Sequence, residues 1–533
     1  MTAAVPGQGF LSSETSIAPH EIPSTDVAVG RELIPASLLR VAGHLAVWLP
    51  VLFATIRNLR VPWVPLADDA HLSLWAYRVF TGHPPLFGSV SMLSPIGHPI
   101  FDPGPLFTYL LAVPVRIDPA TGILWGSALV AGLLGSLSVE LGGRNFGWQA
   151  AAVIGGAIAL LLTAIPVVGL HLVWNPYLGL FVVLTAMVTS LVVASGSGRL
   201  LPLLVVLCSI GACAHTMLAV PLVLLLAVAT TWCWLARPAN IRRWLLLSVA
   251  VGVLCWLPPL LQELFGAKPN LSALFRAVQT GASMGMGFGL SAIAHATPEL
   301  LVHFPHLAGG DDSVAFLNNR SPILGVVIFA LLLGVAMWAI RQKDLLLARA
   351  SSLTLALAVG EVVAFSSVKT RVVFGLSYTT VFLWPLAAAL VFDLGLLLRK
   401  PLMNLDRPLQ PLNRLFVLVF TFATTCSAIF AVATSSVPSE QRGSMRAVSS
   451  AVSWIGAHVP RGPVRIAVLI DGKVTLESAS QLFGMEYLLT TKGFEPPDSE
   501  ILNQGEKPST AGPLVVVVEQ HGAISKIFIA HPS

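Results

Sequence analysis

Eleven stretches of about 20 mostly apolar residues constrain the fold of this chain more than any other feature, because a helix of that length crosses the hydrocarbon core of a bilayer. Only 11% of the residues are charged, whereas a soluble domain carries about 25%. The sequence therefore predicts a polytopic α-helical membrane protein with about 11 transmembrane helices. The apolar runs lie near residues 40–56, 123–141, 149–169, 177–194, 200–215, 217–235, 244–260, 322–340, 350–366, 379–398 and 415–433.

The basic residues between these runs predict the orientation. If the N-terminus is cytoplasmic, the inner loops carry arginines and lysines, whereas the short outer turns at 171–176 and 215–216 carry none. This is the usual excess of positive charge in cytoplasmic loops, and it also accounts for the net charge of +5. We therefore expect a multi-pass protein of the cell membrane with an extracytoplasmic C-terminus. Membrane lipids are expected partners, and nucleic acid is not.

Composition divides the chain into three parts. Residues 1–37 are rich in Ser, Thr, Pro and Gly and predict a disordered cytoplasmic tail. Residues 38–433 form the transmembrane domain, with large outer loops at 57–122 and 261–321. Residues 434–533 alternate β-rich runs with a helical segment, which predicts a small extracytoplasmic α/β domain. Its expected strands cover 464–470, 514–518 and 526–530, and its helix covers 477–491.

The first outer loop opens with two adjacent carboxylates, Asp68 and Asp69, followed by His71. The spacing of Leu72 and Trp75 predicts a short surface helix with its aromatic side in the membrane interface. One aspartate would satisfy the N-cap of this helix. A second one beside it indicates a site where a proton is removed or a cation is bound. The pattern leaves capping and function as alternatives.

Asp102 and Pro103, later in this loop, predict an N-cap and a first-turn residue that open an apolar helix over 104–116. His83 and His98 could join Asp102 as metal ligands, but their spacing matches no zinc pattern. No metal site is therefore assigned, although a divalent cation stays an alternative. No other cofactor is expected.

Together these segments resemble the GT-C superfamily, membrane glycosyltransferases that use polyprenyl-phosphate sugars at the outer face. The resemblance covers roughly residues 40–433: a first span, the acidic pair, two juxtamembrane helices, a His-Pro stretch and further spans. The segments 174–176 and 256–271 resemble uncharacterised actinobacterial arabinosyl- and mannosyltransferase-like members. The chain lacks the Trp-Trp-Asp motif of oligosaccharyltransferases.

The resemblance implies that Asp68 or Asp69 is the general base, with Asp69 favoured as the helix cap and Asp68 as the base. For the donor phosphate, Lys369 and Arg371 follow the ninth apolar run, on the side where topology needs no positive charge. Lipid headgroups are the alternative ligands of these two side chains.

Polar side chains near the expected outer helix ends are candidates for binding sugar or acceptor. Trp174 could instead be an interface anchor, Glu263 could begin a surface helix, and Glu361 could pair with the basic cluster. The glycine-rich stretch 281–290 predicts a flexible flap. The candidates are His71, His98, Asp102, His171, Trp174, Asn175, Glu263 and Glu361.

The sequence thus favours an inverting glycosyltransferase that moves a sugar from a polyprenyl-phosphate donor to a cell-envelope glycan or lipid. The alternatives are a transporter or flippase of lipid-linked sugars and a non-catalytic scaffold for envelope assembly. Transporters usually place polar groups near the bilayer midplane. Here the histidines and the acidic pair concentrate in the outer loops, which favours the enzyme.

Overall fold

A computed structural model of the protein describes residues 34–530 apart from 92, 95–99, 165–174, 267–268, 303–321, 371–381, 406–409, 435–438, 474–475, 496–512 and 521–522. The expected tail 1–37 falls almost wholly outside the described residues. Ile34–Ser533 form one unit by their contacts, and the α/β segment at 434–533 does not separate from the helices as a unit of its own.

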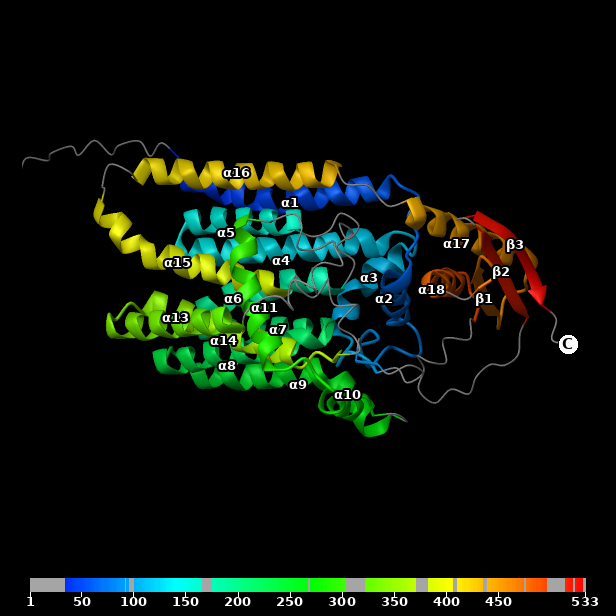
Figure 1. Ribbon diagram of the computed structural model, residues 1–533, viewed down its shortest axis with the longest axis horizontal. Coiled ribbons are helices and arrows are strands. Elements are labelled where there is room, and N and C mark those ends of the chain that lie inside the picture. The colour runs from blue at the N-terminus through cyan, green and yellow to red at the C-terminus, as the bar shows by residue number, and fades with distance from the viewer. Residues whose placement is uncertain are drawn as a thin grey trace, which may run out of the picture. The chain divides into compact units, whose positions relative to one another are not determined.

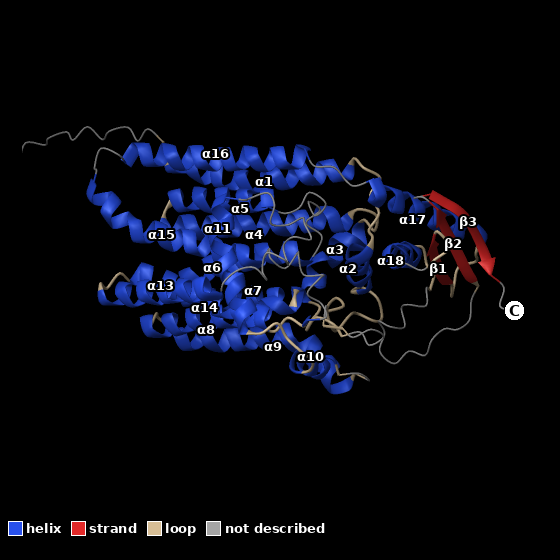
Figure 2. Cartoon of the chain, in the orientation of Figure 1, coloured by secondary structure: helices blue, strands red, loops and turns tan. Residues whose placement is uncertain are grey.

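Helices fill most of this unit (Figures 1 and 2). Each of the eleven predicted apolar runs coincides with a helix: α1 (Ala36–Leu59), α4 (Gly122–Phe146), α5 (Trp148–Ala164), α6 (Asn175–Ala194), α7 (Leu201–Ala214), α8 (Thr216–Ala236), α9 (Ile241–Phe265), α13 (Pro322–Arg341), α14 (Leu345–Ser366), α15 (Leu383–Leu405) and α16 (Gln410–Thr434).

Eight helices in the described part of the chain are long and apolar enough to cross a membrane: α1, α4, α6, α8, α9, α13, α14 and α16. The helices α5, α7 and α15 hold shorter apolar stretches. The protein is therefore a multi-pass membrane protein, as predicted, and the count of eleven spans stays a prediction. α7 is short because His215 adopts an extended backbone conformation and α8 begins at the next residue.

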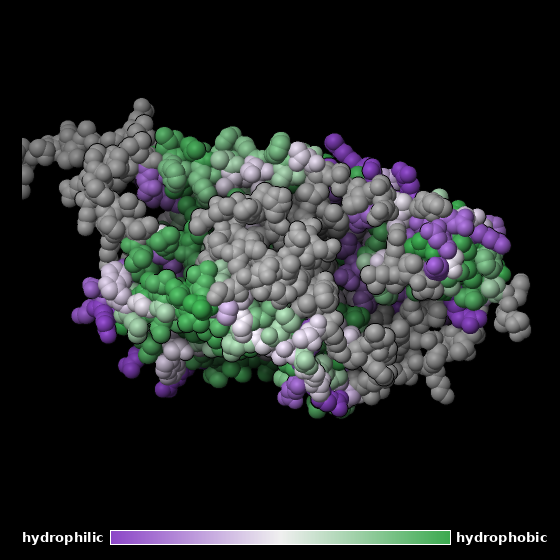
Figure 3. All heavy atoms as spheres, viewed as in Figure 1, coloured by the Kyte–Doolittle hydropathy of each residue, from purple (hydrophilic) through white to green (hydrophobic). Residues whose placement is uncertain are grey.

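On the face that Figure 3 shows, apolar side chains predominate where the surface of the described helices is visible. α9 shows this most clearly, since Leu246 and Leu254 are 71% and 66% exposed. In water such exposure would be unfavourable, but lipid tails are as apolar as leucine. α6, by contrast, has 83% of its apolar window buried by other helices, so it lies inside the bundle.

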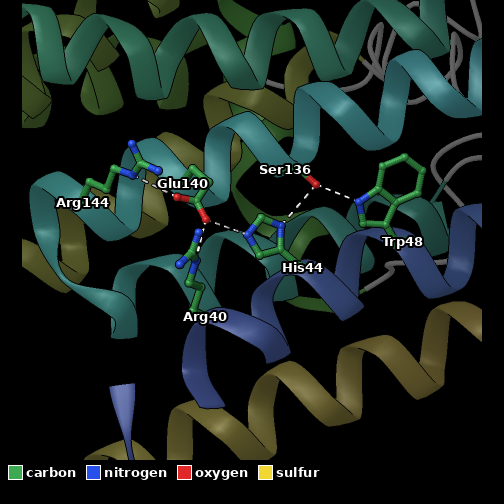
Figure 4. Close-up of polar contacts among 6 residues, drawn as sticks. All are labelled: Arg40, His44, Trp48, Ser136, Glu140 and Arg144. Atoms are coloured by element: carbon green, nitrogen blue, oxygen red, sulfur yellow. Dashed lines mark hydrogen bonds and ion pairs between the residues drawn. The ribbon is translucent and has the colours of Figure 1, made fainter. Parts of the chain in front are cut away.

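Glu140 ties α4 to α1 (Figure 4). Its carboxylate accepts hydrogen bonds from Arg40 of α1 at 2.7 Å and from Arg144 of its own helix at 3.0 Å. His44 Nε2 lies 3.0 Å from the same carboxylate, and His44 Nδ1 lies 3.2 Å from Ser136 Oγ. A carboxylate with two guanidinium partners is well compensated, so this network fixes the register of α1 against α4.

The loop at 57–122, which the sequence predicts to face outward, contains two short helices, as predicted: α2 (Ala67–Arg78) and α3 (Leu106–Ile117). Two details of that prediction were wrong. Pro105 precedes α3 and no side chain caps it, so Asp102 is not its N-cap. Trp75 is 3% exposed and packs on Phe87 and Phe101 at ring distances of 4.9 and 5.8 Å. It is a core residue rather than an interface anchor, because the loop folds back over α2.

The second outer loop contains α10 (Asn270–Gln279) and α11 (Met286–Val302), and the expected glycine flap was wrong. Gly281 and Gly285 adopt positive φ angles and turn the chain into α11. A Cβ at Gly289 would lie 2.4 Å from the Val362 carbonyl oxygen of α14. The Leu290 carbonyl oxygen would likewise lie 2.2 Å from a Cβ at Gly325 of α13. The small residues thus let α11 pack directly against neighbouring backbones.

The C-terminal segment comprises α17 (Ser439–His458), β1 (Arg465–Ile470), α18 (Leu476–Thr491), β2 (Leu514–Gln520) and β3 (Ala523–Ala530). The sheet order is β1-β2-β3, with β1 parallel and β3 antiparallel to β2. Val515 and Val517 of β2 are buried, because α17 and α18 pack against the sheet.

α18 also packs against α2. A Cβ at Gly484 would lie 2.7 Å from the Pro65 carbonyl oxygen. Tyr487, which is buried, donates a hydrogen bond from its hydroxyl to the Pro119 carbonyl oxygen at 2.5 Å. The helix that carries the acidic pair is therefore held by two neighbours, α3 of the same loop and α18 of the C-terminal segment.

Candidate active site

The acidic pair lies in the first turn of α2, behind a strained residue. Ala67 has a φ of 47°, a left-handed conformation that costs about 1–2 kcal/mol for a residue with a Cβ. Leu66 occupies the N-cap position without a side-chain cap, so the expectation that Asp69 is the N-cap was wrong. Asp68 is exposed and Asp69 is buried. Strain of this kind persists where the surroundings require it, often at functional sites.

Asp102 is the second acidic element of the site. Its backbone pairs with the 88–89 segment: the Asp102 N–H donates to the Ser89 carbonyl at 2.7 Å, and the Gly88 N–H donates to the Asp102 carbonyl at 2.9 Å. The side chain is 3% exposed and accepts a hydrogen bond from the backbone N–H of Thr216. A carboxyl from the first loop thus sits on the N-terminus of α8.

The environment of Asp102 favours its neutral form. Burial raises the pKa of Asp102 well above its usual range, and the charge of Asp68 raises it further. The hydrogen bond from Thr216 opposes this shift without reversing it. Asp68 and Asp102 therefore interact, although 33 residues separate them in the sequence. A carboxyl kept neutral in this way can donate a hydrogen bond.

Two further helices contact this region. Asp69 interacts electrostatically with Tyr177 at the start of α6. His215, between α7 and α8, accepts a hydrogen bond on Nδ1 from the Met217 N–H at 3.2 Å and packs its ring on Phe382 at 4.8 Å. The acidic residues thus interact with the start of α6, through Tyr177, and with the start of α8, through Thr216, while Phe382 packs on His215 of the α7–α8 junction.

His71 is buried and is not exposed to solvent. Its ring stacks on Phe483 of α18 at 5.6 Å and meets Trp75 edge-on at the same distance. Burial, together with the nearby Arg78, lowers the pKa of His71 from 6.5 to about 4. His71 is therefore a neutral side chain between α2 and α18.

Replacing His71 by phenylalanine is expected to remove part of the acid sensitivity of the fold. The folded state keeps His71 neutral until about pH 4, whereas the unfolded chain binds the proton below about pH 6.5. Stability therefore falls as the pH drops through this window, by about 3 kcal/mol in total. His71→Phe keeps the stacking and lacks the proton. The drop in melting temperature between pH 7 and pH 4 should be smaller in the variant; equal drops would contradict this assignment.

The remaining predicted residues fall into three groups: side chains with hydrogen-bond partners, a buried carboxylate with no partner among the described residues, and residues that the structure does not describe. Glu263 accepts hydrogen bonds from the N–H groups of Leu271 and Ser272 at 2.8 and 3.2 Å, so it supports the start of α10. Lys369 is 3% exposed and donates from Nζ to the Val278 carbonyl at 2.5 Å. Glu361 is 1% exposed, and neither oxygen has a hydrogen-bond partner among the described residues. The third group lies outside the described residues: His98, His171, Trp174, Arg371 and the side chain of Asn175.

Sequence patterns did not single out Tyr177 or Thr216. Tyr177 is one of only five tyrosines in the chain. Its polar hydroxyl at the start of an apolar run is the signal that could have identified it. Thr216 acts through its backbone N–H, so no side-chain pattern could identify it. Among the described residues no group of three or more His, Cys, Asp and Glu side chains is arranged to hold a metal ion.

No protein-family model and no curated protein matches the chain. It is similar to the solved structure of ArnT from Cupriavidus metallidurans in the apo state, with 16% identity, a TM-score of 0.43, and coverage of 91% of this chain and 93% of that one. ArnT bound to undecaprenyl phosphate gives 14% identity, a TM-score of 0.39 and coverage of 90% and 92%.

The archaeal oligosaccharyltransferase AglB from Archaeoglobus fulgidus, in complex with an inhibitory peptide and a dolichol-phosphate, is 14% identical with a TM-score of 0.37. The match covers 85% of this chain but spans only 64% of the length of that protein. These likenesses do not assign the chain to a family.

Proposed function

We propose that this chain is a membrane glycosyltransferase of the GT-C type, which moves a sugar from a polyprenyl-phosphate donor to a cell-envelope glycan or lipid at the outer face. The observation that carries the proposal is the interaction of exposed Asp68 with buried Asp102 at the N-terminus of α8. Glycosyl transfer needs a base for the acceptor hydroxyl and hydrogen-bond donors for the sugar, and two carboxyls in unlike environments supply both.

In the proposed reaction Asp68 takes the proton of the acceptor hydroxyl, because it is the exposed member of the pair. The hydroxyl oxygen forms the new bond to the anomeric carbon from the face opposite the phosphate. The bond from this carbon to the phosphate oxygen breaks, and its electron pair leaves with the polyprenyl phosphate. The configuration is therefore inverted. Neutral Asp102 donates a hydrogen bond to the sugar and adds no charge that would repel the departing phosphate.

The departing phosphate requires a cation, and Arg371 is our candidate for this role. Lys369 is a less accessible choice, since its ammonium already donates to the Val278 carbonyl. A guanidinium can bind phosphate through two parallel hydrogen bonds. A divalent cation in place of Arg371 stays the alternative.

The experiment that tests the function uses purified protein in lipid nanodiscs, a panel of polyprenyl-phosphate sugars and a panel of envelope-glycan acceptors. We expect free polyprenyl phosphate to be released from one donor only when a matching acceptor is present. Reactions with EDTA and with added Mg²⁺ distinguish a cation from Arg371. Release from no donor, by protein that still binds the lipid, would contradict the proposal.

A transporter of lipid-linked sugars is the second candidate, and buried carboxyls favour it. Beside Glu361, α15 carries Asp393, which is 5% exposed and lies next to Ser351 and Thr354 of α14. Carboxyls inside a span are costly and often functional. Movement of a labelled polyprenyl-phosphate sugar between leaflets of proteoliposomes, without release of polyprenyl phosphate, would support this candidate.

A further inference from the structure

α10 is a short helix with two unlike sides. On one side Ala273, Leu274 and Ala277 pack against Leu93 and Ile100 of the first outer loop. The other side exposes two apolar residues one turn apart, Phe275 at 68% and Val278 at 42%. Exposing a phenylalanine to water is unfavourable by up to about 2–3 kcal/mol, so this side requires an apolar environment.

The exposed side of α10 follows directly on a surface that meets lipid. α9 is a candidate span with only 17% of its apolar window buried, and its last residues, Leu264 and Phe265, are 72% and 80% exposed. α10 begins five residues later. It carries Arg276, which is exposed, and no acidic residue. An apolar face beside a basic residue at the end of a span suits the phosphate-rich headgroup layer.

The N-terminus of α10 is bonded to the loop that carries Asp102. Asn270 is 4% exposed; its Oδ1 accepts from the Phe101 N–H at 2.9 Å and its Nδ2 donates to the Phe101 carbonyl at 3.0 Å. Gln262 Oε1 of α9 in turn accepts from the Asn270 N–H at 3.1 Å. The Asn270 carboxamide thus forms with Phe101, the residue just before Asp102, the pair of hydrogen bonds that a neighbouring β-strand would form.

We infer that α10 lies in the outer headgroup layer with Phe275 toward the acyl chains. Asn270 is then a positioning residue that links this membrane-bound helix to the Asp102 loop. The membrane contact does not depend on the proposed function. Only an effect of the coupling on turnover rests on the proposed function, so the membrane contact can hold even if the proposed function is wrong.

Depth-dependent quenching tests the membrane contact. A bimane label is placed at Phe275→Cys in a background in which the exposed Cys426 is replaced by serine, in vesicles of phosphatidylcholine and phosphatidylglycerol. Bromines near the glycerol backbone should quench it at least about threefold more than in a solvent-facing control, Ser453→Cys on α17. Leu254→Cys in α9 is the membrane-buried control and should prefer bromines deep in the chains. Quenching at Phe275 no stronger than at Ser453 would overturn the inference.

Hydrogen exchange tests the coupling without any substrate. The amides of Gly88 and Asp102, which pair the two segments, should exchange at least about tenfold faster in Asn270→Ala, whereas amides of α4 stay unchanged. Asn270→Asp, which keeps the acceptor for Phe101, should give a smaller change and serves if the alanine variant folds poorly. Gln279→Ala, at the exposed end of the same helix, is the matched control. Unchanged exchange at Asp102 in both Asn270 variants would overturn the coupling.

Discussion

Replacing Asp68 by asparagine is expected to lower acceptor-dependent release of polyprenyl phosphate by about a hundredfold or more. The amide has the shape of the carboxylate and cannot take a proton, and general-base catalysis contributes about 10²–10⁴-fold. The KM for the donor should change little, because the proposed role of Asp68 concerns the acceptor hydroxyl. The measurement is kcat and KM for polyprenyl phosphate release in nanodiscs, with the donor and acceptor that the panel identifies.

Asp69→Asn is the matched control for this substitution. Asp69 is buried beside Tyr177, so its loss should affect the melting temperature more than the rate. A hundredfold loss of rate in Asp69→Asn together with an active Asp68→Asn would exchange the two assignments. If both variants kept full activity, neither aspartate would be the base.

Replacing Gly289 by alanine is expected to destabilise the helix bundle by about 2–3 kcal/mol. The new Cβ would lie 2.4 Å from the Val362 carbonyl oxygen and 2.3 Å from Ser366 Oγ of α14. Backbone atoms of a packed helix cannot withdraw cheaply, and overpacking typically costs about 1–3 kcal/mol. The measurement is the thermal unfolding midpoint in detergent, followed by intrinsic tryptophan fluorescence.

Gly287→Ala, two residues away on the same helix, is the control for this prediction. A Cβ there would meet nothing within 4 Å, and alanine favours a helix over glycine by about 1 kcal/mol. This variant should match or exceed the wild type in stability. Equal midpoints for the two variants would mean that α11 does not pack on α14 as closely as described.

The transmembrane helices could be predicted from the sequence because hydropathy reports directly on the surrounding lipid. Every predicted run overlaps a described helix, and the short helices α2 and α3 lie inside the loop at 57–122. Apolar composition could not predict how residues pack between helices. Trp75 and Gly289 show this. Trp75 was expected in the membrane interface and Gly289 in a flexible flap, but each makes buried contacts whose partners lie elsewhere in the chain.

The candidate site was predictable in part. The two adjacent aspartates of α2 are visible in the sequence, and the structure shows which one is exposed. The position of Asp102 was not predictable, because its pairing with the 88–89 segment and with Thr216 depends on tertiary contacts. Asn270 lies in the segment 256–271 that the sequence marks only by a family resemblance, and its two hydrogen bonds to Phe101 appear only in the structure.

The stacking of His71 on Phe483 makes the C-terminal segment part of the wall behind the acidic pair. A chain cut after α16 would keep every predicted span, yet it would leave the ring of His71 without its stacking partner Phe483. The C-terminal segment should therefore not be treated as an exchangeable appendage. Variants that lose it would carry both aspartates on a helix that has lost one of its two packing partners.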